Sequence, residues 1–290
     1  MIKNLIAYFS RSLRPANPSS VNFEVNSNCN LDCVMCARAE YRDGRTIWDL
    51  AQFKKAFNPI APSHVAIHGY SEPLLNKNLP QLISYAEDNK SKTTITTNLI
   101  LLKSIDQALE IVDSGLKLLK ISIDGNSEDV YAQVRGVKKL AVVKENINIV
   151  EKAKRIRNSN LPLIRLSYTV THYNYHELED FISYVSNETE QGVVFFQMLL
   201  FSDTHLKENK WPIVQKEVFY KAIVAAKNMA DKKKIKTNLD RVVKYFDIYW
   251  SAYAVGEKLQ SKRICLKPWF STFIASNGDV MPCDLLGLGG

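Results

Sequence analysis

The amino-acid sequence predicts an α/β fold in which six strand–helix units form one parallel sheet, curved into an open, partial (β/α)6 barrel. From residue 21 onward, short apolar segments alternate with amphipathic segments of helical periodicity. A helix between two strands brings the second strand back parallel to the first. Most of the polar motifs follow predicted strands directly, and the working groups of parallel α/β folds lie at those carboxyl ends.

Each element is predicted from its own residues. Ser104 is a suitable N-cap for one helix, and Gly115 lies just past the end of that helix. Six strands are expected, at Val21–Asn26, His64–His68, Thr93–Thr97, Leu118–Ile123, Leu163–Thr171 and Val193–Leu200. Helices are expected at Ile47–Phe57, Leu79–Asp88, Ser104–Asp113, along the apolar stripe from Leu140 to Val150, at Tyr175–Val185, and later at Gln215–Lys234 and Leu239–Tyr253.

The pattern divides the chain into four segments. Residues 1–20 are a lead-in, and residues 21–212 form the partial barrel. Residues 213–257 are a helical connection, and residues 258–290 contain two cysteines around a hairpin-like Asn277–Gly278 pair. No internal repeat or low-complexity linker is visible.

Composition narrows the class of protein. The 290 residues are 46% hydrophobic and 23% charged, and the strongest apolar run, Val193–Phe201, is too short to span a bilayer. The apolar stretch Leu5–Phe9 is too short for a signal-peptide core, so we expect a cytoplasmic protein that does not enter membranes. The net charge of +8 leaves open an acidic partner, either a peptide or a phosphorylated or nucleotide-linked small molecule. Without a nucleic-acid-binding signature, no nucleic-acid partner is expected.

Three cysteines follow the first predicted strand in a C-x3-C-x2-C run, as Cys29, Cys33 and Cys36. This spacing puts three thiolates on one short loop, close enough to bind a single polynuclear metal centre. An electron-transfer [4Fe–4S] cluster takes four such ligands. A three-cysteine loop therefore predicts a cluster with one iron left open for another ligand.

Two plainer interpretations of these cysteines compete with the cluster. A structural zinc site needs four ligands, and neither His nor Cys follows Cys36 before His64. A disulfide would leave one of the three thiols unpaired, and the chain has five cysteines in total. Both interpretations fit the spacing less well than the cluster does.

The cysteine run resembles that of the radical S-adenosylmethionine (SAM) enzymes, and the resemblance extends over about residues 21–290. It implies a TIM-like partial barrel whose [4Fe–4S] cluster chelates SAM and, given an electron, cleaves it to a 5′-deoxyadenosyl radical. That radical abstracts hydrogen from a substrate, while the protein supplies binding and orientation. An electron donor such as flavodoxin or ferredoxin is implied as a partner.

The resemblance also assigns SAM contacts after the second and third strands. The segment from Gly69 to Glu72 resembles the family's G-G-E-P motif, with Ser71 in place of a glycine, and implies that Gly69 and Glu72 meet the SAM amino group. Asn98 resembles the asparagine of a T-N-G segment, with Leu99 replacing the glycine. A polar turn is the alternative interpretation at each place.

Two further contacts are implied beyond the fourth strand. Ser122 lies in a segment that resembles the S-x-D-G motif, in which the serine hydroxyl contacts SAM, although Asp124–Gly125 alone is only a strand-ending turn. Arg135 matches an arginine that pairs with the SAM carboxylate in relatives with C-terminal cluster domains. The alternative for Arg135 is a surface position at the start of a helix.

Cys265 and Cys283 enclose a C-x12-G-x4-C pattern that resembles the opening of the SPASM/twitch domain, which binds auxiliary iron–sulfur clusters. Two thiolates are too few for a complete four-thiolate site. The two cysteines are therefore either part of an auxiliary cluster site in an abridged or shortened domain, or reduced thiols of a hairpin packed against the barrel. Trp269, Phe270 and Phe273 are expected to anchor this hairpin.

The expected function is hydrogen abstraction from a peptide or protein, which is the commoner substrate class among SPASM/twitch relatives. The alternatives are a radical SAM dehydrogenase, dehydratase or epimerase acting on a sugar, aminocyclitol or other small molecule, and a non-catalytic iron–sulfur protein for electron transfer or sensing.

The fifth and sixth predicted strands offer weaker candidates for residues of the substrate pocket, because alternation alone does not say which of their side chains face inward. They are Arg165, Tyr168, Thr169 and Gln197.

Overall fold

The six predicted strands form one parallel sheet in chain order, and a seventh and eighth strand extend it at the β1 edge. The computed structural model describes residues 17–36, 46–189, 193–198, 214–251 and 267–283. The strand order is β6-β5-β4-β3-β2-β1-β7-β8, with β8 alone antiparallel to its neighbour. The strands are β1 (Ser20–Phe23), β2 (His64–Ile67), β3 (Lys92–Thr97), β4 (Leu118–Ser122), β5 (Leu163–Val170), β6 (Val194–Met198), β7 (Ser271–Ile274) and β8 (Val280–Met281).

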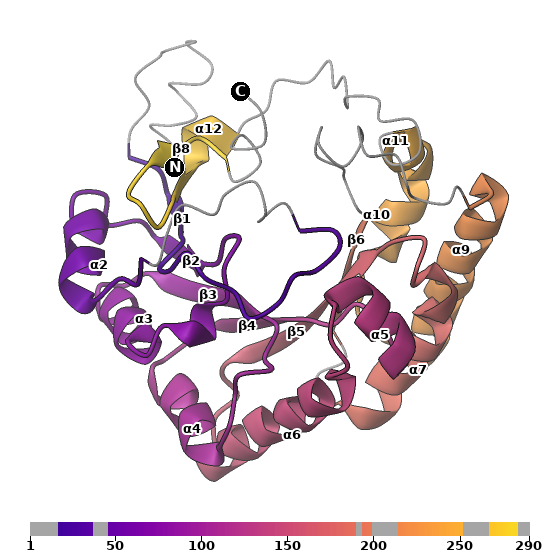
Figure 1. The fold of residues 1–290 in the computed structure, drawn as a ribbon, viewed down its shortest axis with the longest axis horizontal. Coiled ribbons are helices and arrows are strands. Elements are labelled where there is room, and N and C mark those ends of the chain that lie inside the picture. Colours follow the sequence, from indigo (N-terminus) through magenta and orange to yellow (C-terminus); the bar gives the residue numbers. More distant parts are fainter. Residues whose placement is uncertain (1–16, 37–45, 190–192, 199–213, 252–266, 284–290) are drawn as a thin grey trace.

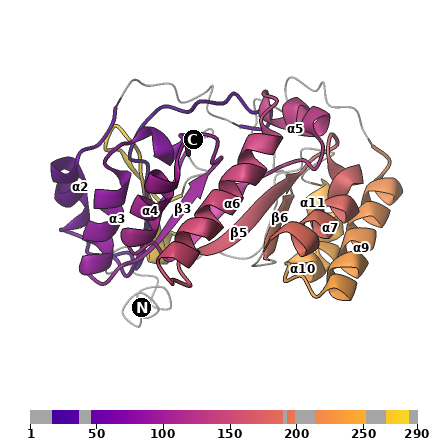
Figure 2. The same ribbon diagram turned by 90° about the horizontal axis from the view of Figure 1, so that it is seen from below.

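The helices lie outside the sheet and form a horseshoe around it (Figure 1), whose open side lies between the β7–β8 hairpin and α10–α11. Figure 2 shows α4 and α6 covering the convex side of the strands. No described helix is both long and apolar enough to cross a membrane. The helices are α2 (Leu50–Phe57), α3 (Leu79–Asp88), α4 (Ile105–Asp113), α5 (Glu128–Arg135), α6 (Leu140–Ile156), α7 (Leu178–Glu188), α9 (Lys216–Lys233), α10 (Leu239–Lys244), α11 (Phe246–Trp250) and α12 (Lys267–Phe270), with single 3-10 turns at Pro73–Leu75 and Tyr175–Glu177.

Alternation along each strand separates a helix-facing side from a concave side. In β4, Leu119 and Ile121 are fully buried in the hydrophobic core, whereas Lys120 and Ser122, which alternate with them, are half-buried. β5 repeats the pattern over eight residues. Successive side chains of a strand point to opposite faces, so the apolar set packs under the helices and the polar set lines the concave side. The expected open, partial barrel is confirmed.

Local caps explain where several helices begin. Ser104 accepts a hydrogen bond from the Gln107 backbone N–H and caps α4, as expected. Asp49 and Gln52 form a reciprocal capping box that starts α2 at Leu50. The prediction that this helix begins at Ile47 was wrong, because Ile47 pairs with Asn26 in an isolated β-bridge.

Two other helix predictions need correction. The expected single helix Leu239–Tyr253 is two short helices separated at Tyr245, whose φ of −112° departs from helical geometry; its last two residues lie outside the described part. The helix α5 was not predicted, although Ser127 caps it and Gly136 ends it in the left-handed region. Arg135 is therefore the last residue of a helix and not an exposed residue at a helix start.

The C-terminal hairpin is part of the barrel wall. β7 pairs with β1 in parallel, and Gly278 provides the positive φ of 92° in the turn before β8. Phe273 is buried, whereas Trp269 and Phe270 are half-buried. The Trp48 indole N–H donates to the Ser276 carbonyl at 2.8 Å, which attaches the turn to the segment before α2. The hairpin expectation is confirmed, and the hairpin covers an edge that β1 would otherwise expose.

Replacement of Phe273 by alanine tests this packing. We expect Phe273→Ala to lower the free energy of unfolding by about 3–5 kcal/mol, because the ring is fully buried and its loss leaves a cavity. Val280→Ala in the neighbouring strand is the matched control, since Val280 is exposed. Urea unfolding of both variants measures the difference, and an equal effect of the two substitutions would contradict the placement of β7 in the core.

Candidate functional site

The cysteine loop leaves the carboxyl end of β1 and is attached to the protein on both sides. The Glu72 backbone N–H donates to the Asn28 carbonyl at 2.8 Å, just before Cys29. The Val34 N–H donates to the Val134 carbonyl of α5 at 3.1 Å. All three loop cysteines are half-buried, and none of the described cysteines is in a disulfide. Backbone hydrogen bonds therefore fix the loop that carries the three thiols.

The donor set fits an iron–sulfur cluster better than a single metal ion. Among the described residues, no three His, Cys, Asp or Glu side chains converge on one point as ligands of one ion. A cubane does not require such convergence, because each of its cysteine ligands binds a different iron. Three thiols spread along one loop meet that requirement, with Cys29, Cys33 and Cys36 as the residues that would hold the cluster.

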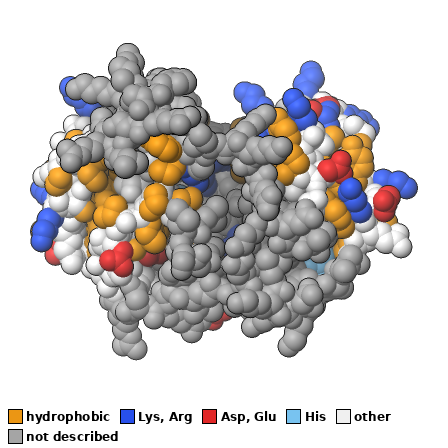
Figure 3. Space-filling view, turned by 90° about the horizontal axis from the view of Figure 1, so that it is seen from above, with side chains coloured by type: hydrophobic (Ala, Val, Ile, Leu, Met, Phe, Trp, Pro, Cys, Tyr) orange, Lys and Arg blue, Asp and Glu red, His pale blue; other side chains and the backbone are white. Residues whose placement is uncertain are grey.

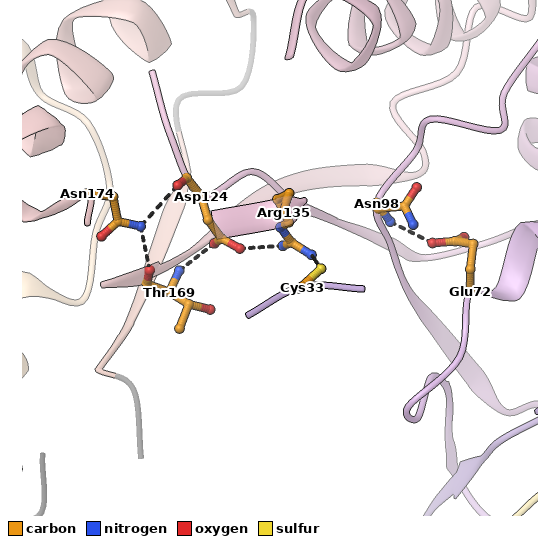
Figure 4. A network of polar contacts seen from close by, with 7 residues as sticks. All are labelled: Cys33, Glu72, Asn98, Asp124, Arg135, Thr169 and Asn174. Atoms are coloured by element: carbon orange, nitrogen blue, oxygen red, sulfur yellow. Dashed lines mark hydrogen bonds and ion pairs between the residues drawn. The ribbon is translucent and has the colours of Figure 1, made fainter. Parts of the chain in front are cut away.

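Glu72 connects the ends of two strands (Figure 4). One carboxylate oxygen accepts hydrogen bonds from the Thr97 hydroxyl and the Leu74 N–H, and the other accepts from the Asn98 N–H at 2.8 Å. Burial raises the pKa of Glu72, and these hydrogen bonds oppose the rise. Glu72 is thus a structural link between the loops after β2 and β3, and its second oxygen retains capacity for another donor.

Asn98 continues this link to the cysteine loop. Its side-chain amide donates to the Asn30 side-chain oxygen at 2.9 Å, one residue beyond Cys29, and its own oxygen accepts from the Ile100 N–H. Leu99 has a φ of 61°, a left-handed conformation that favours glycine. The resemblance in the sequence has glycine at this position, and Leu99 compensates for the backbone strain by burying its side chain completely.

Gly69 allows the chain to pass close to Glu24, which follows β1. A Cβ atom on Gly69 would collide with the Glu24 carboxylate. That carboxylate accepts from the Tyr70 N–H at 2.8 Å and from the Ser276 N–H at 3.3 Å. Glu24 therefore joins the loop after β2 to the C-terminal hairpin, a role that sequence reasoning missed.

A second network lies across the site from Glu72 (Figure 4). The Arg135 guanidinium forms an ion pair with Asp124 through one terminal nitrogen and donates to the Cys33 sulfur at 3.5 Å through the other. Asp124 also accepts from the Thr169 N–H at 2.6 Å. The Asn174 amide donates to the Asp124 and Thr169 carbonyls and so fixes the ends of β4 and β5.

Electrostatics keep the Arg135 guanidinium charged. Its burial disfavours charge, but Asp124 and the nearby Cys33 side chain raise the pKa of Arg135 above its usual range. Burial raises the pKa of Asp124, and Arg135 is the largest influence opposing that rise. The Arg135 guanidinium therefore places a buried positive charge beside the Cys33 sulfur.

These features can be compared with known proteins. A sequence model of the Radical SAM superfamily matches residues 23–185, which is more than half of the chain. The chain belongs to the radical SAM superfamily. The match covers the cysteine run, the Glu72 and Asp124 networks and strands β2 to β5 of the barrel.

Several curated relatives are similar to this radical SAM chain over part of their length. It is 28% identical over 149 residues to 7,8-dihydro-6-hydroxymethylpterin dimethyltransferase of Methanocaldococcus jannaschii, covering 49% of this chain and 29% of that protein. It is 27% identical over 180 residues to GTP 3′,8-cyclase of Tolumonas auensis, covering 59% and 51%. The chain thus spans about half, or less, of the length of these relatives.

Solved structures support the fold. SuiB of Streptococcus suis bound to S-adenosylmethionine superposes with a TM-score of 0.71 at 16% identity, covering 98% of this chain and 65% of SuiB. The structure of anSMEcpe with bound AdoMet superposes with a TM-score of 0.59 at 17% identity, covering 92% of this chain and 74% of that one. At this identity the likeness concerns the fold alone.

The structure brings the sequence-predicted residues of this radical SAM chain to one edge of the sheet. Gly69, Glu72, Asn98 and Arg135 surround the cysteine loop, and Ser122 is half-buried on the concave side at the end of β4. Sequence reasoning missed the partners Glu24 and Asn174, for which no local motif exists, and it named Thr169 only as a weaker pocket candidate. Asp124 was singled out only as a turn residue, although its place in the S-x-D-G segment next to a buried arginine was the available signal.

Of the two C-terminal cysteines, the structure describes only Cys283. Cys265 lies outside the described residues. Cys283 is half-buried just after β8, with the Lys267 ammonium 3.9 Å from its sulfur. The auxiliary cluster and the SPASM/twitch assignment therefore stay predictions.

The Arg135–Asp124 pair yields a stability prediction. In Arg135→Gln, the Asp124 carboxyl loses its cation while still buried, and we expect the free energy of unfolding at neutral pH to fall by about 3–5 kcal/mol. The loss shrinks as pH falls, because the folded state then holds a proton on Asp124 that the unfolded state has not yet bound. Denaturant unfolding at several pH values measures both effects.

Two companion variants make this prediction specific. Asp124→Asn combined with Arg135→Gln should recover part of the loss, since neither charge then remains buried alone. Arg157→Gln removes an arginine from an exposed ion pair with Asp113 and should change stability little. A loss in Arg135→Gln that neither depends on pH nor recovers in the double variant would refute the coupling.

Proposed function

We propose that this chain cleaves SAM reductively, with Cys29, Cys33 and Cys36 holding the [4Fe–4S] cluster, and that it abstracts hydrogen from a bound substrate. The observation that carries the proposal is the held three-thiol loop, which lies between the Glu72–Asn98 network and the Arg135–Asp124 pair. When bound, the cluster and SAM supply a 5′-deoxyadenosyl radical as the hydrogen acceptor.

The protein's own residues supply position and charge. Arg135 places positive charge beside Cys33, which lowers the cost of an anionic ligand set in a half-buried loop. Asn98 holds the Cys29 end of the loop, and Val134 holds the Val34 region. These contacts fix the loop before any cofactor binds, as a precise cofactor site requires.

The proposed SAM contacts use the hydrogen-bonding capacity that remains. The second oxygen of Glu72 accepts only the Asn98 N–H among the described contacts, so it can also accept from the SAM amino group. The Nε of Arg135 has no hydrogen-bond partner among the described residues, which leaves a donor for the SAM carboxylate. Ser122 is proposed to contact SAM through its hydroxyl, and Gly69 through its backbone.

The competing candidate is a non-catalytic iron–sulfur protein. Anaerobic reconstitution followed by EPR separates the two, because only the enzyme should show a cluster spectrum that added SAM perturbs. Dithionite, which substitutes for a flavodoxin or ferredoxin donor, should then yield 5′-deoxyadenosine. Absence of both signals in iron-loaded protein would refute the proposed reaction.

Two cysteine variants locate the reaction at the N-terminal loop. We expect Cys33→Ala to abolish formation of 5′-deoxyadenosine, since two thiolates do not hold the cluster. Cys283→Ala should retain uncoupled SAM cleavage, because Cys283 lies after β8 on a different segment. Chromatographic quantification of 5′-deoxyadenosine measures both, and complete loss in two equally well-folded variants would contradict the separation of these sites.

Two substrate classes are proposed. Modification of a peptide or protein is the first, and its support is a fold like that of SuiB, a structure of which contains the precursor peptide SuiA. A small molecule is the second. It is favoured by the names of the sequence relatives, which include GTP 3′,8-cyclase and, from Streptomyces venezuelae, dTDP-4-amino-4,6-dideoxy-D-glucose ammonia-lyase.

A further inference from the structure

The concave face of the sheet carries positive charge without acidic residues of its own. Strands β1 to β6 contain no aspartate or glutamate, and the concave positions of β3, β4 and β5 are mainly Thr, Ser and the two cations Lys120 and Arg165. These cations lie on adjacent strands in direct register, Lys120 opposite Arg165. Figure 3 looks into the open side of the barrel and shows Lys or Arg side chains inside a central hollow.

Arg165 is half-buried and has its charge uncompensated within the described part of the chain. Its Nε is buried and has no hydrogen-bond partner there, and no described carboxylate forms an ion pair with it. Its guanidinium stacks over the Phe195 ring, with Cζ 5.0 Å from the ring centroid. Burial alone lowers the pKa of Arg165, although a guanidinium stays charged.

This arrangement is costly unless an anion completes it. Removing a cation from water without a partner is unfavourable, and a bidentate carboxylate or phosphate is the usual partner of a guanidinium fork. The stacking on Phe195 holds the fork in one plane, which limits the entropy lost on binding. A second cation in register suits a group with more than one negatively charged oxygen.

This pair lies deeper along the strands than the residues proposed to contact SAM. Arg165 lies four residues before Thr169, and Lys120 lies four residues before Asp124, which pairs with Arg135. At the rise of an extended strand, both cations are therefore about 13 Å farther from the Arg135 end of the site. A molecule bound there by one end would extend toward the cysteine loop, with Ser167 and Ser122 between as the next concave pair in register.

We propose that Arg165 and Lys120 form an anion subsite that binds a phosphate or carboxylate group of the substrate and directs the rest of the molecule toward the SAM site. That the bound molecule is the substrate rests on the proposed function. Phe195 is a positioning residue that orients the Arg165 fork.

Isothermal titration of the full-length chain, without SAM or reductant, tests the subsite. Inorganic pyrophosphate is the phosphate probe and succinate the carboxylate probe. We expect at least one to bind the wild-type protein with millimolar affinity or better. Arg165→Gln and Lys120→Gln should each weaken binding about tenfold or more, which corresponds to about 1.4 kcal/mol. The probe that binds more tightly identifies the group.

Controls separate a binding effect from a folding effect. Arg157→Gln removes one arginine charge from the outer surface and should leave probe binding unchanged. Arg165→Lys keeps the charge without the planar fork and should bind with intermediate affinity. If Arg165→Gln does not fold, judged by thermal unfolding, Arg165→Lys and Lys120→Gln decide the question.

The outcomes are distinct from those for the proposed reaction. Binding of neither probe by the wild-type chain, or equal binding by wild type and the Arg165 and Lys120 variants, would overturn the subsite. A wild-type chain that binds a probe but forms no 5′-deoxyadenosine would instead refute the radical reaction and leave the anion site intact.

Discussion

The buried ion pair between Arg135 and Asp124 is the interaction on which the candidate site depends. It joins α5 to the end of β4, and through Thr169 to β5, while its other terminal nitrogen contacts Cys33. A buried pair of this kind stabilises less than its Coulomb attraction suggests, because both charges lose their hydration. Its main value here is positional, since it fixes a cation beside one thiol of the cysteine loop.

The loops around the cysteines are interdependent because each motif satisfies the polar groups of another. Glu72 accepts from the loop after β3, Asn98 reaches the cysteine loop, and Glu24 joins the loop after β2 to the C-terminal hairpin. Unpaired buried polar groups are costly, so such a closed set of partners favours one arrangement of all the loops. This explains why residues far apart in the chain form one site at a single edge of the sheet.

The strand–helix order, and the edge at which the site lies, were predictable from the sequence because apolar periodicity reports burial directly. Individual partners were not. Glu24 contacts Ser276 across most of the chain, and no local pattern encodes such a contact. The missed α5 has only eight residues and is polar on average, and its end depends on Gly136 adopting a positive φ of 78°. Leu99 shows a different limit. A leucine is not expected in the left-handed backbone conformation, yet Leu99 adopts it and is fully buried.

The same alternation that builds the core also determines what the barrel can bind. Helices lie over the apolar side of the central strands (Figure 2), so the concave side there is left to residues that packing does not select. On that side the strands carry hydroxyls, Lys120 and Arg165, and an aromatic ring against the guanidinium. Charge at the loops is balanced by Asp124, whereas the strands below offer no acidic residue to do the same. The described strands below the loops therefore carry cations and no carboxylate of their own.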